Sequence, residues 1–375
     1  SHTSTTGGAT AIGEQPIKGL LDPAAMARLA VGEALTNLVW APVSALPDVR
    51  VSANWMWAAK LPGEGAALHD AAVAMKDIML ELGMAVDGGK DSISMAARAP
   101  DGRGGDETVK SPGELVISAY VTCPDITKTV SPDLKRAGSG RLLYVDLGGG
   151  AHRLGGSALA QVYGQIGDVP PDVDDVQRLR RAFEVVQAEL LAGRILAGHD
   201  RSDGGLVTTL LEMAFAGNVG IEVGLDAEPG IDTIQCLFSE ELGLVLEVAE
   251  GDADAVISAF TEQNVPCAAI GRTTKEQDVR IRYGEELVLD ASMVALRDVW
   301  EETSFQLDRL QANPACVEEE QQGLKHRTGP SFVVPYTPEE TAAALLEKSD
   351  KPKVAILREE GSNGDREMTS AFYAA

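Results

Sequence analysis

The densest group of chemically useful residues in this chain is the run His199–Gly205. It places two acidic side chains, a hydroxyl group and two glycines directly before an apolar helical pattern. Ser202 and Asp203 are favourable helix N-cap residues, and Gly204 and Gly205 would let backbone N–H groups approach a ligand. A helix N-terminus favours phosphate oxygens, and an adjacent carboxylate can hold the accompanying divalent cation. Taken alone, the run also fits an ordinary capped turn.

A second candidate lies within the apolar helical pattern after Asp22-Pro23. Glu33 and Asn37 are four residues apart, so their side chains project from one face of a helix. A carboxylate and an amide oxygen in apolar surroundings suit a hard cation such as Mg²⁺. The pair also fits a solvated stripe or a hydrogen-bonded buried pair, because a Glu-x-x-x-Asn spacing is common by chance.

A third candidate is the run Asp87–Ser92, in which two glycines precede Lys90 and Asp91. Its backbone N–H groups could hold a phosphate, with the lysine as counter-charge. It lacks the spacing of a Walker A loop, and a turn is an equal alternative. The run Ser239–Glu241 could equally border a site or form a solvated turn. No serine, cysteine or histidine arrangement indicates covalent catalysis, so no catalytic residue is assigned.

Amino-acid composition and net charge limit the classes of ligand that this chain could bind. The 375 residues have room for two or three domains, and 44% of them are hydrophobic. There are 57 acidic and 32 basic residues, for a formal net charge of −25. Such a surface disfavours nucleic acid and anionic membranes as partners. A phosphate ligand would need local cations, which favours a Mg²⁺-bridged nucleotide over binding by a basic patch.

The four cysteines are widely spaced and indicate a reduced, intracellular protein. Neither a membrane-spanning stretch nor a signal peptide is evident, so we predict a cytoplasmic location. The chain starts with Ser1 and stops within a helical pattern, and we expect it to be part of a longer protein.

The pattern predicts a linker or arm over residues 1–20 and a mixed α+β domain over 21–137. An α/β domain over 138–312 follows, then a linker over 313–350 and the start of a further domain over 351–375. Residues 86–94 are expected to form a glycine-bearing loop. Helices are expected at 22–39, 68–82, 158–165, 176–192, 292–311 and 338–348; strands are expected at 48–57, 115–122, 141–147, 220–224, 243–248, 268–271, 279–283 and 353–357.

Taken together, these runs resemble the phosphoribosylformylglycinamidine synthase family, also called formylglycinamide ribonucleotide amidotransferase. The similarity is to the second half of the synthetase region in the large, single-chain form, and it covers nearly the whole chain after about Gly7. Residues 353–368 resemble the first strand and turn of the glutaminase domain. The matching stretches are residues 13–16, 20–23, 32–37, 52–56, 89–92, 199–205, 212–217 and 300–304.

The resemblance implies an aminoimidazole-ribonucleotide-synthetase-like fold of mixed α/β and α+β type. An N-terminal half-domain would form half of a pseudo-dimeric barrel, with a C-terminal α/β domain beside it and a truncated flavodoxin-like glutaminase start. It also implies the reaction: ATP phosphorylates the amide oxygen of formylglycinamide ribonucleotide, and ammonia from glutamine displaces that phosphate.

The resemblance further implies that Glu33, Asn37 and Asp200 are magnesium ligands and that Ser202 contacts the nucleotide. The partners would be the missing N-terminal synthetase half and the glutaminase domain. This nucleotide site could be catalytic or structural, and the chain alone is expected to be inactive with glutamine. The alternatives are a non-catalytic nucleotide-binding scaffold and another ATP-using member of the same fold group.

Overall fold

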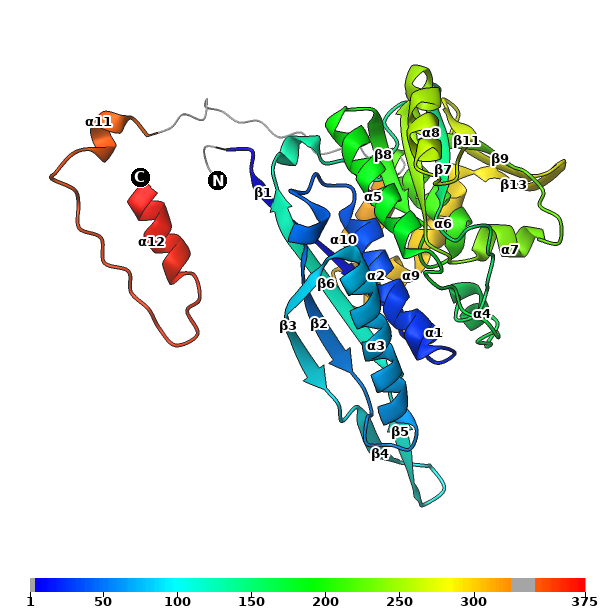
Figure 1. The fold of residues 1–375 in the computed structure, drawn as a ribbon, viewed down its shortest axis with the longest axis horizontal. Coiled ribbons are helices and arrows are strands. Elements are labelled where there is room, and N and C mark those ends of the chain that lie inside the picture. The colour runs from blue at the N-terminus through cyan, green and yellow to red at the C-terminus, as the bar shows by residue number, and fades with distance from the viewer. Residues whose placement is uncertain (1–3, 325–340, 375) are drawn as a thin grey trace. The chain divides into compact units, whose positions relative to one another are not determined.

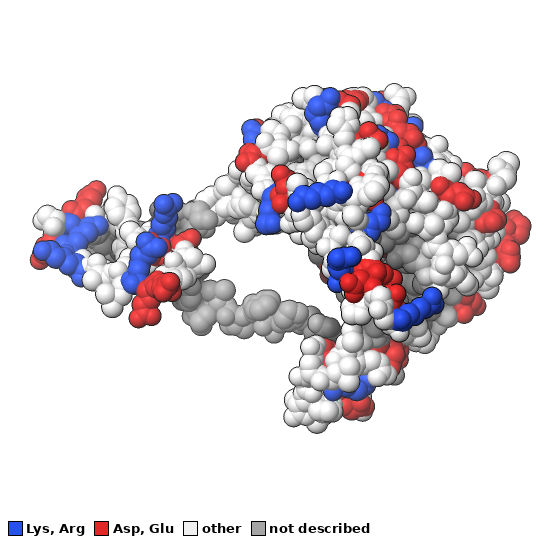
Figure 2. Space-filling view, turned by 90° about the horizontal axis from the view of Figure 1, so that it is seen from below, with Lys and Arg blue, Asp and Glu red and all other residues white. Residues whose placement is uncertain are grey.

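The structure is a computed structural model that describes residues 4–324 and 341–374. The chain divides into a large unit, Thr6–Lys325, and a small unit made of Ser1–Thr5 and His326–Ala375. Among the described residues, no helix combines the length and apolar character that a membrane span requires. On the face drawn in Figure 2, Lys and Arg side chains are interspersed with Asp and Glu, so the described residues there form no extended basic surface.

The first half of the large unit is a four-stranded sheet with two helices on one face (Figure 1). Its strand order is β1-β6-β2-β3, with β2 and β3 parallel and the other pairs antiparallel. Alternate residues of β6 are buried, as expected for a sheet with one covered face. The strands are β1 (Gly7–Gly13), β2 (Arg50–Met56), β3 (Ala85–Ser92) and β6 (Glu114–Cys123); the helices are α1 (Pro16–Gly19), α2 (Pro23–Leu38) and α3 (Glu64–Leu82). A hairpin of β4 (Ala96–Pro100) and β5 (Asp106–Lys110) extends beyond this sheet.

The second half is a seven-stranded mixed sheet in the order β13-β12-β9-β11-β7-β10-β8. Helices pack on both faces, α5 and α8 on one, α6 and α9 on the other. The strands are β7 (Gly140–Asp146), β8 (Ile195–Asp200), β9 (Gly220–Leu225), β10 (Gly243–Ala249), β11 (Cys267–Thr274), β12 (Asp278–Tyr283) and β13 (Glu286–Ser292). The helices are α4 (Ala158–Val162), α5 (Val176–Leu191), α6 (Gly205–Gly217), α7 (Thr233–Phe238), α8 (Ala253–Glu262), α9 (Met293–Gln311) and α10 (Pro314–Gly323). Among the described residues, short 3-10 helices occur at η1 (Leu46–Asp48) and η2 (Ile126–Lys128) in the first half and at η3 (Glu250–Asp252) in the second.

Helix α2 joins the two halves. Asp22 caps it by accepting hydrogen bonds from two backbone N–H groups of its first turn. Eleven of its residues are buried, because it packs against β1 and β6 on one side and against β8 and α5 on the other. Such a helix is apolar on nearly every face. It carries Glu33 to the end of β8, where Asp200 lies.

Several expected elements differ in the structure. Residues 1–20 are not an unstructured arm, since β1 pairs with β6 along seven residues and α1 follows. Residues 86–94 are not a loop, because hydrogen bonding to β2 makes most of them strand β3 despite the glycines. Pairing with a neighbouring strand here outweighs low intrinsic strand propensity.

The small unit contains α11 (Ala343–Leu346) and α12 (Asp365–Ala374). The buried strand expected at 353–357 is wrong: these residues form no strand and are largely exposed. A strand needs a hydrogen-bonding neighbour, and no described strand pairs with this segment. The expected linker at 313–350 begins with α10, and residues 325–340 lie outside the described residues, as does the start of the helix expected at 338–348.

Candidate functional site

The candidate site is built around two carboxylates from different halves of the large unit, Glu33 and Asp200. The Glu33 side chain accepts a hydrogen bond from the Glu14 backbone N–H at 2.7 Å. Burial raises the pKa of Glu33 to about 7, and the negative charges of Asp200 and Asp203 contribute to the increase. The two predicted ligands Glu33 and Asp200 are therefore electrostatic neighbours.

Asp200 ends β8 and is 4% exposed. Its Oδ1 atom lies 3.1 Å from His199 Nδ1, and its backbone carbonyl accepts a hydrogen bond from Thr209 Oγ1 at 3.0 Å. Its Oδ2 atom is buried and has no hydrogen-bond partner among the described residues. A buried carboxylate oxygen without a partner is costly, and its proximity to Glu33 adds like-charge repulsion. A divalent cation would offset both costs, so these residues fit Mg²⁺.

Asn37 lies one turn after Glu33 on α2 and is exposed. Its side-chain amide donates to the Ile12 carbonyl at 3.0 Å, which leaves the amide oxygen without a recorded partner. No recorded contact joins Asn37 to Asp200. Within residues 4–324 and 341–374, no group of three or more His, Cys, Asp or Glu side chains is placed to hold a metal ion.

The turn Ser202–Gly205 differs from expectation in how helix α6 begins. The N-cap residue is Gly204, in the left-handed region with φ 84°, and no side chain caps the helix. The expected capping by Ser202 or Asp203 is therefore wrong. The backbone N–H of Gly204 donates to Glu240 Oε1 at 2.7 Å, and that of Gly205 donates to the Ser202 carbonyl at 2.9 Å. These two N–H groups already have partners within the chain, so a phosphate at this turn would have to replace them.

Lys18 is the residue that sequence reasoning missed at this turn, and its partner Glu240 belongs to the run Ser239–Glu241, for which a position at the border of a site was one of two alternatives. Lys18 Nζ lies 2.7 Å from Glu240 Oε2, and both side chains are almost completely buried. The other oxygen of Glu240 also accepts from the Ala158 N–H at 2.8 Å. Ser239, Glu240 and Glu241 are all buried, so the solvated-turn alternative for this run is wrong. No local signal marks Lys18, because its partner is more than 200 residues away.

Lys90 and Asp91 lie on β3, the edge strand of the first sheet, and both are exposed. Lys90 Nζ donates to Ser92 Oγ at 2.8 Å. Among the described residues, no recorded hydrogen bond or ion pair joins them to Glu33, Asp200 or the Gly204 turn. The structure therefore does not bring these two predicted residues together with the others.

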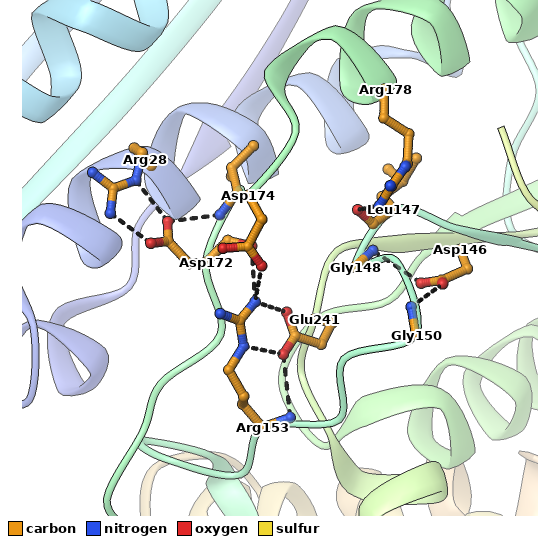
Figure 3. Close-up of polar contacts among 11 residues, drawn as sticks. Arg28, Asp146, Leu147, Gly148, Gly150, Arg153, Asp172, Asp174, Arg178 and Glu241 are labelled. Atoms are coloured by element: carbon orange, nitrogen blue, oxygen red, sulfur yellow. Dashed lines mark hydrogen bonds and ion pairs between the residues drawn. The ribbon is translucent and has the colours of Figure 1, made fainter. Parts of the chain in front are cut away.

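Arg28 and Arg153 form ion pairs with carboxylates of neighbouring segments (Figure 3). Arg153 makes two hydrogen bonds to the Glu241 carboxylate, at 2.6 and 2.8 Å, and one to Asp174 at 2.7 Å. Arg28 of α2 binds Asp172 through two parallel bonds at 2.7 and 2.5 Å. Paired bonds between arginine and carboxylate are geometrically specific. They connect the segment between β7 and α5 to α2 and to the residues that precede β10.

His199 bridges two carboxylates at the end of β8. Its Nε2 atom lies 3.2 Å from Glu212 Oε2, and its Nδ1 atom faces Asp200. Burial alone would lower the pKa of His199, but hydrogen bonds to Asp200 and Glu212 raise it to about 10. Sequence reasoning gave His199 no role, although it opens the motif.

Two family models match the chain. Residues 1–122 match the FGAR-AT PurM_N-like domain, and residues 140–284 match the C-terminal domain of AIR synthase related proteins. A probable phosphoribosylformylglycinamidine synthase of Arabidopsis thaliana, named as chloroplastic/mitochondrial, is 59% identical over 376 residues. The match covers 100% of this chain and 26% of that protein.

The phosphoribosylformylglycinamidine synthase of Homo sapiens is 55% identical over 379 residues, which cover 100% of this chain and 28% of the human protein. The chain thus spans just over a quarter of these relatives. Among solved structures, Thermotoga maritima PurL complexed with FGAR gives a TM-score of 0.61 at 14% identity, covering 98% of this chain and 52% of PurL. The same protein complexed with ATP gives a TM-score of 0.55 at 15% identity, covering 98% of this chain and 50% of PurL. These similarities confirm the aminoimidazole-ribonucleotide-synthetase-like fold.

Proposed function

Because the chain belongs to the phosphoribosylformylglycinamidine synthase family, we propose that it contributes a Mg²⁺–nucleotide site to an ATP-dependent ligase of purine biosynthesis. The whole enzyme would convert formylglycinamide ribonucleotide, glutamine and ATP to formylglycinamidine ribonucleotide. The 55–59% identity over the whole chain supports this assignment.

The observation that carries the metal site is the buried Oδ2 atom of Asp200, which has no partner among the described residues, beside the partly buried carboxylate of Glu33. We propose that these two side chains hold Mg²⁺, with the amide oxygen of Asn37 as a further ligand. Mg²⁺ would neutralise negative charge on the phosphates of the bound nucleotide. The side-chain hydroxyl of Ser202 has no recorded partner among the described residues, and we propose it as a nucleotide contact.

Two features favour a nucleotide that stabilises the fold over a nucleotide that is consumed in the reaction. The Gly204 N–H is already bonded to Glu240, and Lys18 is committed to the same carboxylate. Both donors are already engaged by Glu240, so they do not stabilise the negative charge that develops on the phosphate during phosphoryl transfer. The second candidate function is therefore a non-catalytic nucleotide-binding half that stabilises the enzyme.

The proposed partners are an N-terminal synthetase half and a glutaminase domain, and the proposed location is the cytoplasm. Within this chain we propose a synthetase-like N-terminal half-domain over 21–137, to whose sheet β1 (Gly7–Gly13) also belongs, and a C-terminal domain over 138–312. Lys90 and Asp91, on the edge strand β3, are proposed to contact a nucleotide only together with the missing synthetase half.

Calorimetric titration with Mg²⁺ and ADP or ATP tests the site. Asp200→Asn keeps the size of the side chain but removes its charge, so we expect Mg²⁺–nucleotide affinity to fall at least about tenfold. Asp254→Asn, at the start of α8, is a control that should bind like the parent chain. Equal affinity of the Asp200→Asn variant and the parent chain would overturn the metal assignment.

A further inference from the structure

The two carboxylate oxygens of Asp200 differ in their contacts. His199 Nδ1 lies 2.8 Å from the Asp200 carbonyl oxygen and 3.1 Å from its Oδ1 atom. The opposite nitrogen of the same ring, Nε2, lies 3.2 Å from Glu212 Oε2. The imidazole ring therefore bridges two carboxylates, and among the residues that the structure describes Asp200 Oδ2 has no hydrogen-bond partner.

Helix α6 supplies the supports for this arrangement. Thr209 and Glu212 are three residues apart on α6, so they lie on neighbouring positions of one helix face. Thr209 Oγ1 donates to the Asp200 carbonyl, and Glu212 faces the His199 ring. The side chains of His199 and Asp200 are 19% and 5% exposed, so water competes little for these contacts.

We propose that His199 is a positioning residue for the cation ligand Asp200, and that Glu212 orients His199 in turn. This inference rests on the proposed Mg²⁺ site. A carboxylate can rotate about its Cβ–Cγ bond, and a donor fixed on Oδ1 stops that rotation. The contact then leaves Oδ2 as the oxygen that can bind the cation. Partners of metal ligands orient them in this way and influence metal affinity strongly.

Binding of Mn²⁺, followed by the electron paramagnetic resonance signal of the free ion, tests the proposal on the whole chain. His199→Leu removes the donor to Oδ1, and we expect Mn²⁺ affinity to fall about tenfold or more. His199→Asn places an amide N–H near the position of Nδ1, so it should restore affinity to within about threefold of the parent chain. Glu212→Gln should fall between these two variants.

His69→Leu is the matched control. His69 Nδ1 lies 3.4 Å from Asp70 Oδ1 on α3, but both side chains are highly exposed. This variant should leave Mn²⁺ affinity unchanged. Thermal unfolding without metal is measured on every variant, because a purely structural contact would change the unfolding temperature without changing Mn²⁺ affinity.

Three outcomes would overturn the inference. Equal Mn²⁺ affinity of His199→Leu and the parent chain would remove the positioning role while leaving the metal site intact. An affinity of His199→Asn as low as that of His199→Leu would show that the contact to Oδ1 is not what matters. Absence of Mn²⁺ binding by the parent chain would overturn both the metal site and the positioning role.

Discussion

At the scale of single residues, the chemistry of Glu33 depends on groups that are remote in the sequence. Its pKa is raised to about 7 mainly by burial, with a contribution from Asp200 and Asp203. Near neutral pH, a large fraction of this carboxyl group therefore carries its proton when no cation is bound. Binding of a cation would favour the ionised form and release that proton.

The raised pKa of Glu33 predicts how stability varies with pH. A carboxyl group whose pKa is higher in the folded than in the unfolded state stabilises the fold fully below the unfolded value of about 4.5. That contribution is lost as the pH rises through about 7, and it amounts to about 3 kcal/mol. We therefore expect the free energy of unfolding of Glu33→Gln, relative to that of the parent chain, to increase as the pH is raised from 5 to 8. Urea unfolding without metal measures this difference. A stability difference that stays constant over this range would contradict the raised pKa.

Lys18 and Glu240 form a buried ion pair that holds the turn at the start of α6. Lys18→Met would leave the Glu240 carboxylate buried without its cation, so we expect the free energy of unfolding to fall by about 3 kcal/mol or more. Lys76→Met is the control, because the Lys76–Asp77 pair is largely exposed and should contribute less than about 1 kcal/mol. Similar losses in the two variants, in urea unfolding, would rule out a stabilising role for the buried pair.

At the scale of elements, α2 positions the site because it can approach the second sheet closely. A Cβ atom at Gly32 would lie 2.4 Å from Leu242 Cδ1 and 3.3 Å from Val173 Cγ2. The residue immediately before Glu33 is therefore in close contact with the segments that precede β10 and α5. The glycine here serves packing, since its φ is not positive.

Gly32→Ala should be destabilising although alanine is the better helix former. The added methyl group must displace Leu242 or α2 itself, and overpacking of this kind costs about 1–3 kcal/mol. Gly323→Ala on α10 is the control, because nothing lies within 4 Å of the added atom. Chemical unfolding should show a loss for the first variant and no loss for the second. A gain in stability for Gly32→Ala would contradict this close packing of α2 against Leu242.

At the scale of the large unit, one hydrophobic core connects both sheets. It contains residues of the first sheet, such as Val51 and Ile117, and residues of the second, such as Leu143 and Leu244. Helix α2 lies between them and contributes Leu35, which is fully buried. The two halves of Thr6–Lys325 accordingly form a single compact unit, although separate family models match them.

This shared core predicts that the two sheets unfold together. Leu35→Ala removes buried apolar volume from α2, and we expect a loss of about 3 kcal/mol. Hydrogen exchange measured by mass spectrometry should show faster global exchange in peptides of both β6 and β10. Leu80→Ala on α3 is the control, because Leu80 is exposed. It should change neither the free energy of unfolding nor the exchange of the β6 and β10 peptides. Acceleration confined to peptides of one sheet would indicate that the two halves unfold independently.

The sequence alone predicted most helices and strands of the large unit. Apolar periodicity and capping are local signals, as for α2, whose start at Asp22-Pro23 is confirmed. The sequence was also sufficient for the family, because many ordered motifs match along the chain. It misassigned β1, β3 and residues 353–357, because strand formation depends on a partner strand that can be distant in the chain or absent from it.

Tertiary structure alone decided which polar groups meet. Glu33 and Asp200 are 167 residues apart in the sequence, and they interact because α2 packs against the end of β8. Packing also brought Glu240 and Lys18 to the turn where a phosphate was expected. Hydrogen bonds and ion pairs between distant segments are set by the geometry of packed elements. Residue types and local spacing do not contain that information.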